Sequence, residues 1–455
     1  MLASALRKSR PRTEIRFASL DKNQEVQTIS AIRRFQPNLV AITVYDWEIS
    51  KAQTLANNIR EIAEMDPQLA DIYVGIGGPS PTTDPENAAG VIGADFAVRG
   101  AGELVLPAIA QILAPFRRWQ TLPETVLDEL ADLPGTIFLA DRRADKYIGR
   151  RQQESNALSQ AEMEATDLDP EIVRQALGEA DNFTMVLGRG CRQHCVFCTP
   201  SRAERQAGTP SAAWVMRQWA TVAQAAPAGQ KLKLILADLD FLAFTERNRE
   251  LVSLWRDPAN ALLRQQLEIT QLETSLASFL ADIPGNLEIL RGLQVGQVDF
   301  GTDGFEEKLY QRLAKGGNFH QIEGAIAAVA GAGLVQGHYA ILSDAKTDIQ
   351  GFLTALFNLR EYQLRYPASF KVASVNPFLI PAYGTPAFRR QLEPGYAELV
   401  VSEQLTRGRF SFPVMYYECP NDPLARKAAE FFAHELAGIP FERRVQLTLN
   451  EFGNL

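Results

Sequence analysis

Short apolar stretches alternate with amphipathic stretches along most of this chain, and no other sequence feature constrains its fold as strongly. In the middle of the chain, apolar stretches at Phe183–Gly188, Leu267–Thr274 and Gly337–Leu342 have the length of single strands. Segments with helical periodicity, such as Ala212–Ala226, lie between them. Strands that alternate with helices form a parallel sheet with helices outside it. The sequence therefore predicts an α/β fold.

The alternation also predicts how the chain is divided. Residues 1–115 are expected to form a Rossmann-like domain, and residues 183–388 an open or closed barrel of strands and helices. The polar segment 116–182 is expected to be a linker, and residues 389–455 a small, mainly helical C-terminal region. Asp422 and Pro423 are expected to begin a helix there, because Asp is a preferred N-cap and Pro fits the first helical turn.

Each unit has its own expected elements. In the first unit, strands are expected at Thr13–Leu20, Leu39–Tyr45, Asp71–Pro79 and Asp95–Gly100, and helices at Glu25–Phe35, Ile49–Ala63 and Leu104–Leu113. In the second unit, further strands are expected at Lys231–Phe241, Gln297–Phe300 and Asn376–Pro386, and a further helix at Phe305–Gly316. Ligands of such sheets bind at the carboxyl ends of the strands.

Length and composition exclude several classes of protein. The chain has 455 residues, 46% of them hydrophobic and 22% charged, which is typical of a globular protein of two or three domains. A net charge of −8 does not favour a nucleic-acid partner. No stretch approaches the roughly 20 apolar residues of a membrane span, and no secretory signal is visible. The expected location is the cytoplasm.

Three of the four cysteines lie within eight residues, as Cys191, Cys195 and Cys198. They occupy a polar, glycine-containing stretch that follows an expected strand. Thiols at this spacing suit an iron–sulfur cluster or zinc. His194 could complete a zinc site, but three thiols with no second ligand pair favour a four-iron cluster with one iron open to a ligand. Cys419 stands far from the others, so this chain has too few cysteines to ligate a second cluster fully by thiolates.

The stretch Cys191-Arg-Gln-His-Cys195-Val-Phe-Cys198 resembles the signature of radical S-adenosylmethionine (SAM) enzymes. The resemblance implies a partial (β/α) barrel in which the three cysteines hold a 4Fe–4S cluster and the open iron binds SAM. It also implies that Phe197, next to the third cysteine, lies near the adenine of SAM.

Motifs further along the chain extend the resemblance. Similar enzymes have polar groups and turns near SAM at the strand ends, which in this chain correspond to Asp238, Asp240, Thr302, Asp303 and Gly384. Simpler interpretations exist for each residue alone. The aspartates and Thr302 are of types that commonly cap helices, and Gly384-Thr385-Pro386 has the composition of a turn.

The first 115 residues resemble the cobalamin-binding domain of B12-dependent radical SAM enzymes. The matching stretches are Pro37–Thr43, Gly77–Pro79 and Val98–Glu103. The resemblance assigns these residues to cobalamin: Tyr45, Gly77, Gly78, Pro79, Gly100, Gly102 and Glu103. Two departures leave a purely structural domain as the alternative. The family's first strand is missing, and no His precedes His194, so a histidine of this domain cannot ligate cobalt.

The resemblance implies a cobalamin-dependent methyltransferase that acts on an unactivated carbon of a small-molecule or natural-product substrate. The cofactors would be a 4Fe–4S cluster, SAM and cobalamin, and an external protein such as flavodoxin or ferredoxin would supply electrons. SAM cleavage would give a 5′-deoxyadenosyl radical that removes hydrogen from the substrate. Two alternatives remain open: a radical SAM enzyme that performs a cyclisation, rearrangement or SAM-fragment transfer, and a non-enzymatic protein that binds a cluster or zinc.

Overall fold

The computed structural model describes residues 1–17, 25–66, 69–118, 120–151, 158–178, 182–198, 208–227, 229–390, 393 and 400–453. The chain forms two compact units. Unit 1 comprises Met1–Leu158, Ala165–Ala176 and Ser402–Met415, and unit 2 comprises Ser159–Glu164, Leu177–Val401 and Tyr416–Leu455. In the described part of the chain, every helix is too short or too polar to span a bilayer.

Unit 1 is built on a five-stranded sheet in the order β1-β2-β3-β4-β5. Strands β1 (Leu39–Thr43), β2 (Tyr73–Gly77) and β3 (Phe96–Val98) are parallel, as the sequence predicts. The antiparallel hairpin β4 (Thr136–Asp141) and β5 (Lys146–Ile148) extends the sheet beyond β3. This hairpin lies in the segment that we expected to be a linker, so part of that segment completes the first sheet.

The helices of unit 1 follow from local sequence. They are α1 (Leu2–Ser9), α2 (Glu25–Phe35), α3 (Ile49–Met65), α4 (Pro79–Thr83), α5 (Pro85–Ile92), α6 (Val105–Leu113), α7 (Glu124–Ala131) and α9 (Pro170–Leu177). Helix α3 buries Ile49, Ala52, Leu55, Ala56, Ile59 and Ile62 at helical spacing. Helix α5 begins where the Asp84 carboxylate accepts a hydrogen bond from Asn87 N–H, and it ends at Gly93 in the left-handed conformation.

One expected strand of unit 1 is not formed as predicted. Residues 13–17 of the expected strand Thr13–Leu20 have no strand structure, and residues 18–20 lie outside the described residues. The stretch carries charged residues at Glu14 and Arg16, and both are exposed. Alternation of polar and apolar residues over so few positions is weak support for a strand, because burial against a neighbour decides the outcome.

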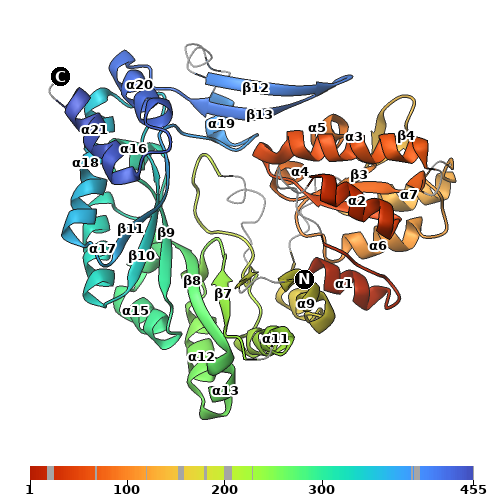
Figure 1. The fold of residues 1–455 in the computed structure, drawn as a ribbon, viewed down its shortest axis with the longest axis horizontal. Helices are drawn as coiled ribbons and strands as arrows, with labels where there is room; N and C mark the ends of the chain where they lie inside the picture. The colour runs from red at the N-terminus through yellow and green to blue at the C-terminus, as the bar shows by residue number, and fades with distance from the viewer. Residues whose placement is uncertain are drawn as a thin grey trace. The chain divides into compact units, whose positions relative to one another are not determined.

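Unit 2 contains a six-stranded, entirely parallel sheet in the order β11-β10-β9-β8-β7-β6. The strands are β6 (Asn182–Met185), β7 (Leu232–Leu236), β8 (Leu267–Ser275), β9 (Gln297–Gly304), β10 (Val335–Ile341) and β11 (Phe370–Asn376). Figure 1 shows the longer helices of this unit along the outer side of the curved sheet. Among the longer of these helices are α11 (Ala212–Ala225), α12 (Thr245–Arg256), α15 (Ile283–Gly292), α17 (Ile322–Gly331) and α18 (Ile349–Arg365). The predicted α/β fold with a partial barrel is confirmed.

Shorter helices connect these elements. They are α8 (Gln160–Glu164), α13 (Ala261–Gln266), α14 (Leu276–Ala281), α16 (Glu307–Arg312) and α19 (Pro386–Arg390). The last strand of the sheet ends at Asn376, where we expected it to begin. Pro377 and Pro381 lack the N–H that a strand inside a sheet must donate, so the chain leaves the sheet at this point. Leu379 instead forms an isolated antiparallel bridge with Glu418.

The C-terminal region combines helices with a hairpin that the sequence did not predict. Asp422 caps α20 (Pro423–Glu430), with Pro423 at its first position as predicted, and α21 (Phe441–Phe452) follows. Before them, β12 (Val400–Arg407) and β13 (Phe410–Glu418) form a separate two-stranded sheet. Residues Ser402–Met415 of this hairpin belong to unit 1.

Within unit 1 the hairpin packs against α5. A Cβ atom added to Gly90 would lie 2.1 Å from the Phe410 ring, so this contact needs glycine. Arg407 donates a hydrogen bond to the Gly90 carbonyl (3.0 Å). Tyr147 meets the Phe410 ring edge-on, with 5.7 Å between centroids. A segment from late in the chain is therefore part of the core of unit 1.

Candidate functional site

The loop that carries the three cysteines follows β6 and is held at its far end by two other segments. Leu313 O accepts a hydrogen bond from Val196 N–H (3.2 Å). Ala387 N–H and Ala382 N–H donate to the carbonyls of Val196 (2.9 Å) and Phe197 (2.8 Å). The Val196 and Phe197 side chains also pack on a cluster formed by Leu309, Leu313, Ile341, Leu379 and Ala387. The loop containing Cys195 and Cys198 is thus fixed by both its backbone and its side chains.

The start of this loop is held by Asp238, at the end of β7. The buried Asp238 carboxylate accepts a hydrogen bond from Leu187 N–H (2.5 Å). It lies 3.7 Å from the guanidinium of Arg247, which is also buried. Burial raises the pKa of Asp238, and Arg247 opposes this rise. In this structure Asp238 therefore acts on the loop through the protein backbone.

Asp240 links the ends of two neighbouring strands. Its carboxylate accepts hydrogen bonds from the hydroxyl groups of Thr274 (3.0 Å), Ser275 (2.9 Å) and Ser278 (2.8 Å), and from Ser275 N–H (3.0 Å). These donors lie at the end of β8 and in α14. Ser275 also accepts a hydrogen bond from the Gln193 amide (3.3 Å). Asp240 thereby supports the cysteine loop indirectly, through Ser275 and Gln193.

Asp303 and Lys315 form an ion pair next to Cys195 of the cysteine loop. Asp303 has a positive φ of 58°, and its carboxylate lies 2.5 Å from Lys315 Nζ. The Lys315 side chain is 8% exposed, and its ammonium lies 5.9 Å from the centre of the Phe197 ring. Cys195 accepts a hydrogen bond from Lys315. Burial alone would lower the pKa of Lys315, but Asp303 and Cys195 raise it above its usual value, so the ammonium stays charged.

Sequence reasoning did not identify Lys315 as a site residue, although the neighbouring glycine carried a signal. A Cβ atom added to Gly316 would lie 2.1 Å from Oε1 of Gln193 in the cysteine loop and 3.0 Å from Cβ of Ala277. The Gly316 carbonyl also accepts a hydrogen bond from the Tyr310 hydroxyl (2.6 Å). The glycine at the end of the expected helix Phe305–Gly316 therefore marks close contact with another segment.

Thr302 faces the opposite side of β9 from Asp303 and belongs to a buried hydrogen-bonded chain. Its hydroxyl lies 2.7 Å from Nδ1 of His338, and Nε2 of His338 lies 3.0 Å from Oε1 of Gln336. Nε2 of Gln336 donates to Ile326 O and Ser369 Oγ, so its Oε1 must accept. His338 therefore carries its proton on Nε2. Burial lowers the pKa of His338 to about 3, which keeps the ring neutral.

Gly384 lies in the turn that follows the last strand of the sheet. Its φ of 74° is in the left-handed region that favours glycine. In the same turn, Thr385 donates its hydroxyl to Ala382 O (2.7 Å), and Ala382 N–H binds the Phe197 carbonyl. The structure therefore brings the Gly384 turn to the cysteine loop.

The three thiols share a loop, but they are not already arranged as a metal site. Among the described residues, no three His, Cys, Asp or Glu side chains are placed to hold a metal ion. Burial raises the pKa of Cys191 to about 11 and also raises the pKa of Cys195. The Cys191 sulfur accepts a hydrogen bond from Gln193 N–H (3.5 Å). The donor set fits iron by its chemistry, and the ligand assignment to Cys191, Cys195 and Cys198 stays a prediction.

Acidic and phenolic side chains line the sheet face that carries Asp303. Glu273 on β8 lies opposite Asp299 on β9, and Ser275 lies opposite Gly301, so these residues share one face. The Tyr339 hydroxyl donates to Glu273 Oε1 (3.4 Å). Burial raises the pKa values of Glu273 and Asp299, and each is therefore protonated up to a higher pH than usual. Sequence reasoning missed these residues because they lie inside strands.

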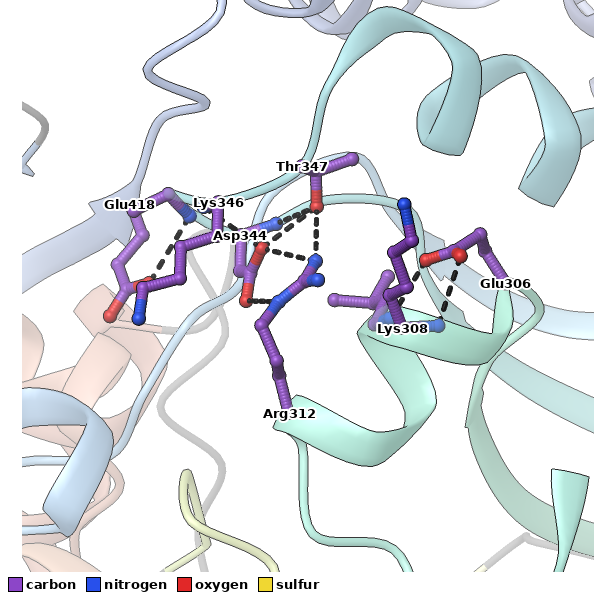
Figure 2. A network of polar contacts seen from close by, with 9 residues as sticks. Glu306, Lys308, Arg312, Asp344, Lys346, Thr347 and Glu418 are labelled. Carbon is purple, nitrogen blue, oxygen red and sulfur yellow. Dashed lines mark hydrogen bonds and ion pairs between the residues drawn. The ribbon is translucent and has the colours of Figure 1, made fainter.

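A polar network ties α16 to the loop that follows β10 (Figure 2). Arg312 donates to both carboxylate oxygens of Asp344 (2.7 and 2.8 Å) and to the Thr347 hydroxyl (3.0 Å). Ala345 N–H donates to Glu418 (3.4 Å). A pocket of about 170 Å³ lies beside this network and is lined by Glu306, Lys308, Arg312, Lys346, Thr347, Asp348, Gln350, Gly351 and Thr354. Because α16 also carries Leu309, the network fixes a helix that supports the cysteine loop.

In unit 1, the residues assigned to cobalamin lie at the carboxyl ends of three adjacent parallel strands. Tyr45 follows β1, Gly77 to Pro79 end β2 and begin α4, and Gly100 to Glu103 follow β3. Thr82 connects the last two groups, because its hydroxyl donates to Gly78 O (2.7 Å) and accepts from Gly100 N–H (3.0 Å). The structure thus gathers the seven residues at one edge of the sheet.

Two features of this edge suit a large, flat ligand. Gly78 has a φ of 105°, and an added Cβ would lie 2.9 Å from Val44 O, so only glycine allows this close crossing of the chain. Tyr45 and Trp47 stack with 4.9 Å between ring centroids, and they are 39% and 68% exposed. The individual ligand contacts stay predictions.

Comparisons with known proteins agree with this architecture. Residues 1–110 match the family model described as the B12 binding domain. The chain is similar to the cobalamin-dependent S-adenosylmethionine radical enzyme OxsB with aqua-cobalamin bound, with 14% identity, a TM-score of 0.66, and coverage of 90% of this chain and 60% of OxsB. It is also similar to the radical S-adenosylmethionine methyltransferase TsrM from Kitasatospora setae, with 14% identity, a TM-score of 0.65, and coverage of 99% of this chain and 96% of TsrM.

No curated protein matches the chain in sequence. The chain spans only 60% of the length of OxsB, and identities of this size show a shared fold. The predicted resemblance is confirmed at that level: a segment of the B12-binding type precedes a partial barrel, and the chain has the fold of cobalamin-dependent radical SAM enzymes.

Proposed function

We propose that this protein is a cobalamin-dependent radical SAM methyltransferase that acts on an unactivated carbon of a small molecule. The observation that carries the proposal is the position of the cysteine loop. It lies at the carboxyl end of the first barrel strand and is held there by Asp238, Leu313 and Ala382. The B12-type segment at the start of the chain supports the cobalamin part of the proposal.

The chain's own residues would have distinct tasks. Cys191, Cys195 and Cys198 would hold a 4Fe–4S cluster, and Phe197 would support the adenine of SAM. When bound, the cluster, SAM and cobalamin would supply the radical and methyl-transfer chemistry. A reduced flavodoxin or ferredoxin is the proposed electron donor. The barrel face with Glu273 and Asp299 would bind the substrate, and burial raises the pKa values of both carboxyl groups.

The first test is cofactor loading. The chain is reconstituted with iron and sulfide without oxygen, given hydroxocobalamin and desalted, and its iron content and visible spectrum are recorded. About four irons per chain and stoichiometric cobalamin are expected. Four irons without cobalamin would make the first unit a structural domain, and a chain that binds no cluster would contradict the proposal.

The second test replaces the cluster ligands. Each of Cys191→Ala, Cys195→Ala and Cys198→Ala is expected to abolish SAM cleavage to 5′-deoxyadenosine under reducing conditions, because each removes one thiolate of the cluster. Cys419→Ala is the matched control, since Cys419 is buried but lies far from the triplet in sequence. Cleavage retained by any of the three triplet variants would refute the assignment.

The mass of the product separates this proposal from other radical SAM reactions. Methylation adds one CH2 to the substrate, whereas a cyclisation, rearrangement or SAM-fragment transfer does not. An unmethylated product together with normal SAM cleavage would support the alternative reaction types.

A further inference from the structure

Lys315 occupies a position that the proposed function leaves without a role. It follows α16 and lies between two acceptors on different segments, the Asp303 carboxylate at 2.5 Å and the Cys195 sulfur. The two side chains of the ion pair are only 8% and 14% exposed. Burying an ammonium group is costly unless its charge is balanced by its neighbours.

An unusual backbone conformation and a close contact flank this ion pair. Asp303 has a positive φ of 58°, an uncommon conformation for a residue other than glycine. On the other side, Gly316 contacts Gln193 and Ala277 so closely that a Cβ atom would clash. The Tyr310 hydroxyl binds Gly316 O. Lys315 is therefore held against the cysteine loop from both of its neighbouring segments.

We propose that Lys315 is a positioning residue that sets the reduction potential of the iron–sulfur cluster, through its charge and its hydrogen bond to the Cys195 sulfur. This inference rests on the proposed function, because it requires Cys195 to be a cluster ligand. The potential of such a cluster depends on net charge, on hydrogen bonds to its sulfurs and on solvent exposure. The reduced cluster carries one more negative charge than the oxidised cluster, so a nearby cation favours reduction.

The charge of Asp303 is expected to have the opposite effect on the reduction potential of the cluster. Its carboxylate balances the charge of Lys315 and holds the ammonium in place. Removing the lysine charge should make the potential more negative, whereas removing the aspartate charge should make it less negative. Two substitutions in one ion pair are thus expected to shift the potential in opposite directions, which loss of a merely structural ion pair would not produce.

The test is a redox titration of the reconstituted cluster without SAM, followed by electron paramagnetic resonance. Lys315→Met is expected to shift the midpoint potential to a more negative value, and Lys315→Arg is expected to restore it toward the wild-type value. Asp303→Asn is expected to shift it to a less negative value. Lys308→Met is the matched control, because it removes an exposed lysine charge from α16 and should leave the potential unchanged.

Each outcome decides the inference. If Lys315→Met does not retain a cluster, the sign of the Asp303→Asn shift still tests the proposal. An unchanged potential, or shifts of the same sign in Lys315→Met and Asp303→Asn, would overturn this inference alone. A wild-type chain that binds no four-iron cluster would overturn the proposed function and this inference together.

Discussion

At the scale of single residues, His338 shows how burial converts a titratable group into a structural one. The neutral ring accepts from Thr302 and donates to Gln336, and its pKa is lowered to about 3 by burial. In the unfolded chain the same group binds a proton below about pH 6.5. Between about pH 3 and about pH 6.5, the unfolded chain binds more protons at this residue than the folded chain does. The free energy of unfolding should therefore decrease as the pH falls, by up to about 1.4 kcal/mol per pH unit from this group.

The variant that tests this prediction is His338→Gln. Its free energy of unfolding, measured by urea titration between pH 6.5 and pH 4.5, should depend less steeply on pH than that of the wild type. His320→Gln removes an exposed histidine and should retain the wild-type slope. Equal slopes for His338→Gln and the wild type would show that His338 does not titrate in this way.

At the scale of elements, the cysteine loop depends on backbone hydrogen bonds from other segments. Ala382→Pro removes the N–H that binds Phe197 O, at a position that already follows Pro381. One such bond contributes about 0.5–1.5 kcal/mol, so amide exchange of residues 195–198 should become about fivefold faster. Ala382→Ser keeps the N–H and should preserve protection. Unchanged amide exchange in Ala382→Pro would mean that the other contacts are enough to protect residues 195–198 from exchange.

Most elements could be predicted from sequence, because hydrophobic periodicity and helix caps are local signals. The strands β6 to β10 and helices α2, α3 and α11 agree with expectation, and so does the Asp422 cap. The partners of side chains could not be predicted. The Lys315 ion pair and the Glu273 face join segments that are distant in sequence, and no local pattern specifies such pairs.

The limits of two elements were also beyond sequence reasoning. The final barrel strand ends at Asn376 because tertiary pairing stops where the prolines begin. No local pattern in the sequence predicts the hairpin of β12 and β13. The hairpin packs against Gly90, in a segment more than 300 residues earlier, and local sequence does not specify such a contact. In both cases, contacts with distant segments determine where a strand forms, because strand propensity alone does not.

At the scale of the whole molecule, unit 1 depends on a segment close to the other end of the chain. Phe410 is 3% exposed and packs over Gly90 and Tyr147. Phe410→Ala should therefore destabilise unit 1 by about 3–5 kcal/mol, the usual cost of removing a buried phenylalanine. Amide hydrogen exchange of this variant should become faster in β1 to β3 but stay unchanged in β6 to β10. Phe357→Ala, which changes a side chain that is 53% exposed, should cost about 0.5 kcal/mol or less. Equal losses in both units would contradict the prediction.

The same hairpin has a consequence for how the protein is made. During translation, the strands β1 to β5 leave the ribosome long before Ser402–Met415, the segment that completes their unit. At the usual rate of about 5–20 residues per second, the gap lasts on the order of tens of seconds. Throughout that time the surface around Gly90 lacks its final covering. Unit 1 therefore emerges first, but it is completed only after Ser402–Met415 has been synthesised. A nascent chain truncated before Ser402 is expected to bind chaperones.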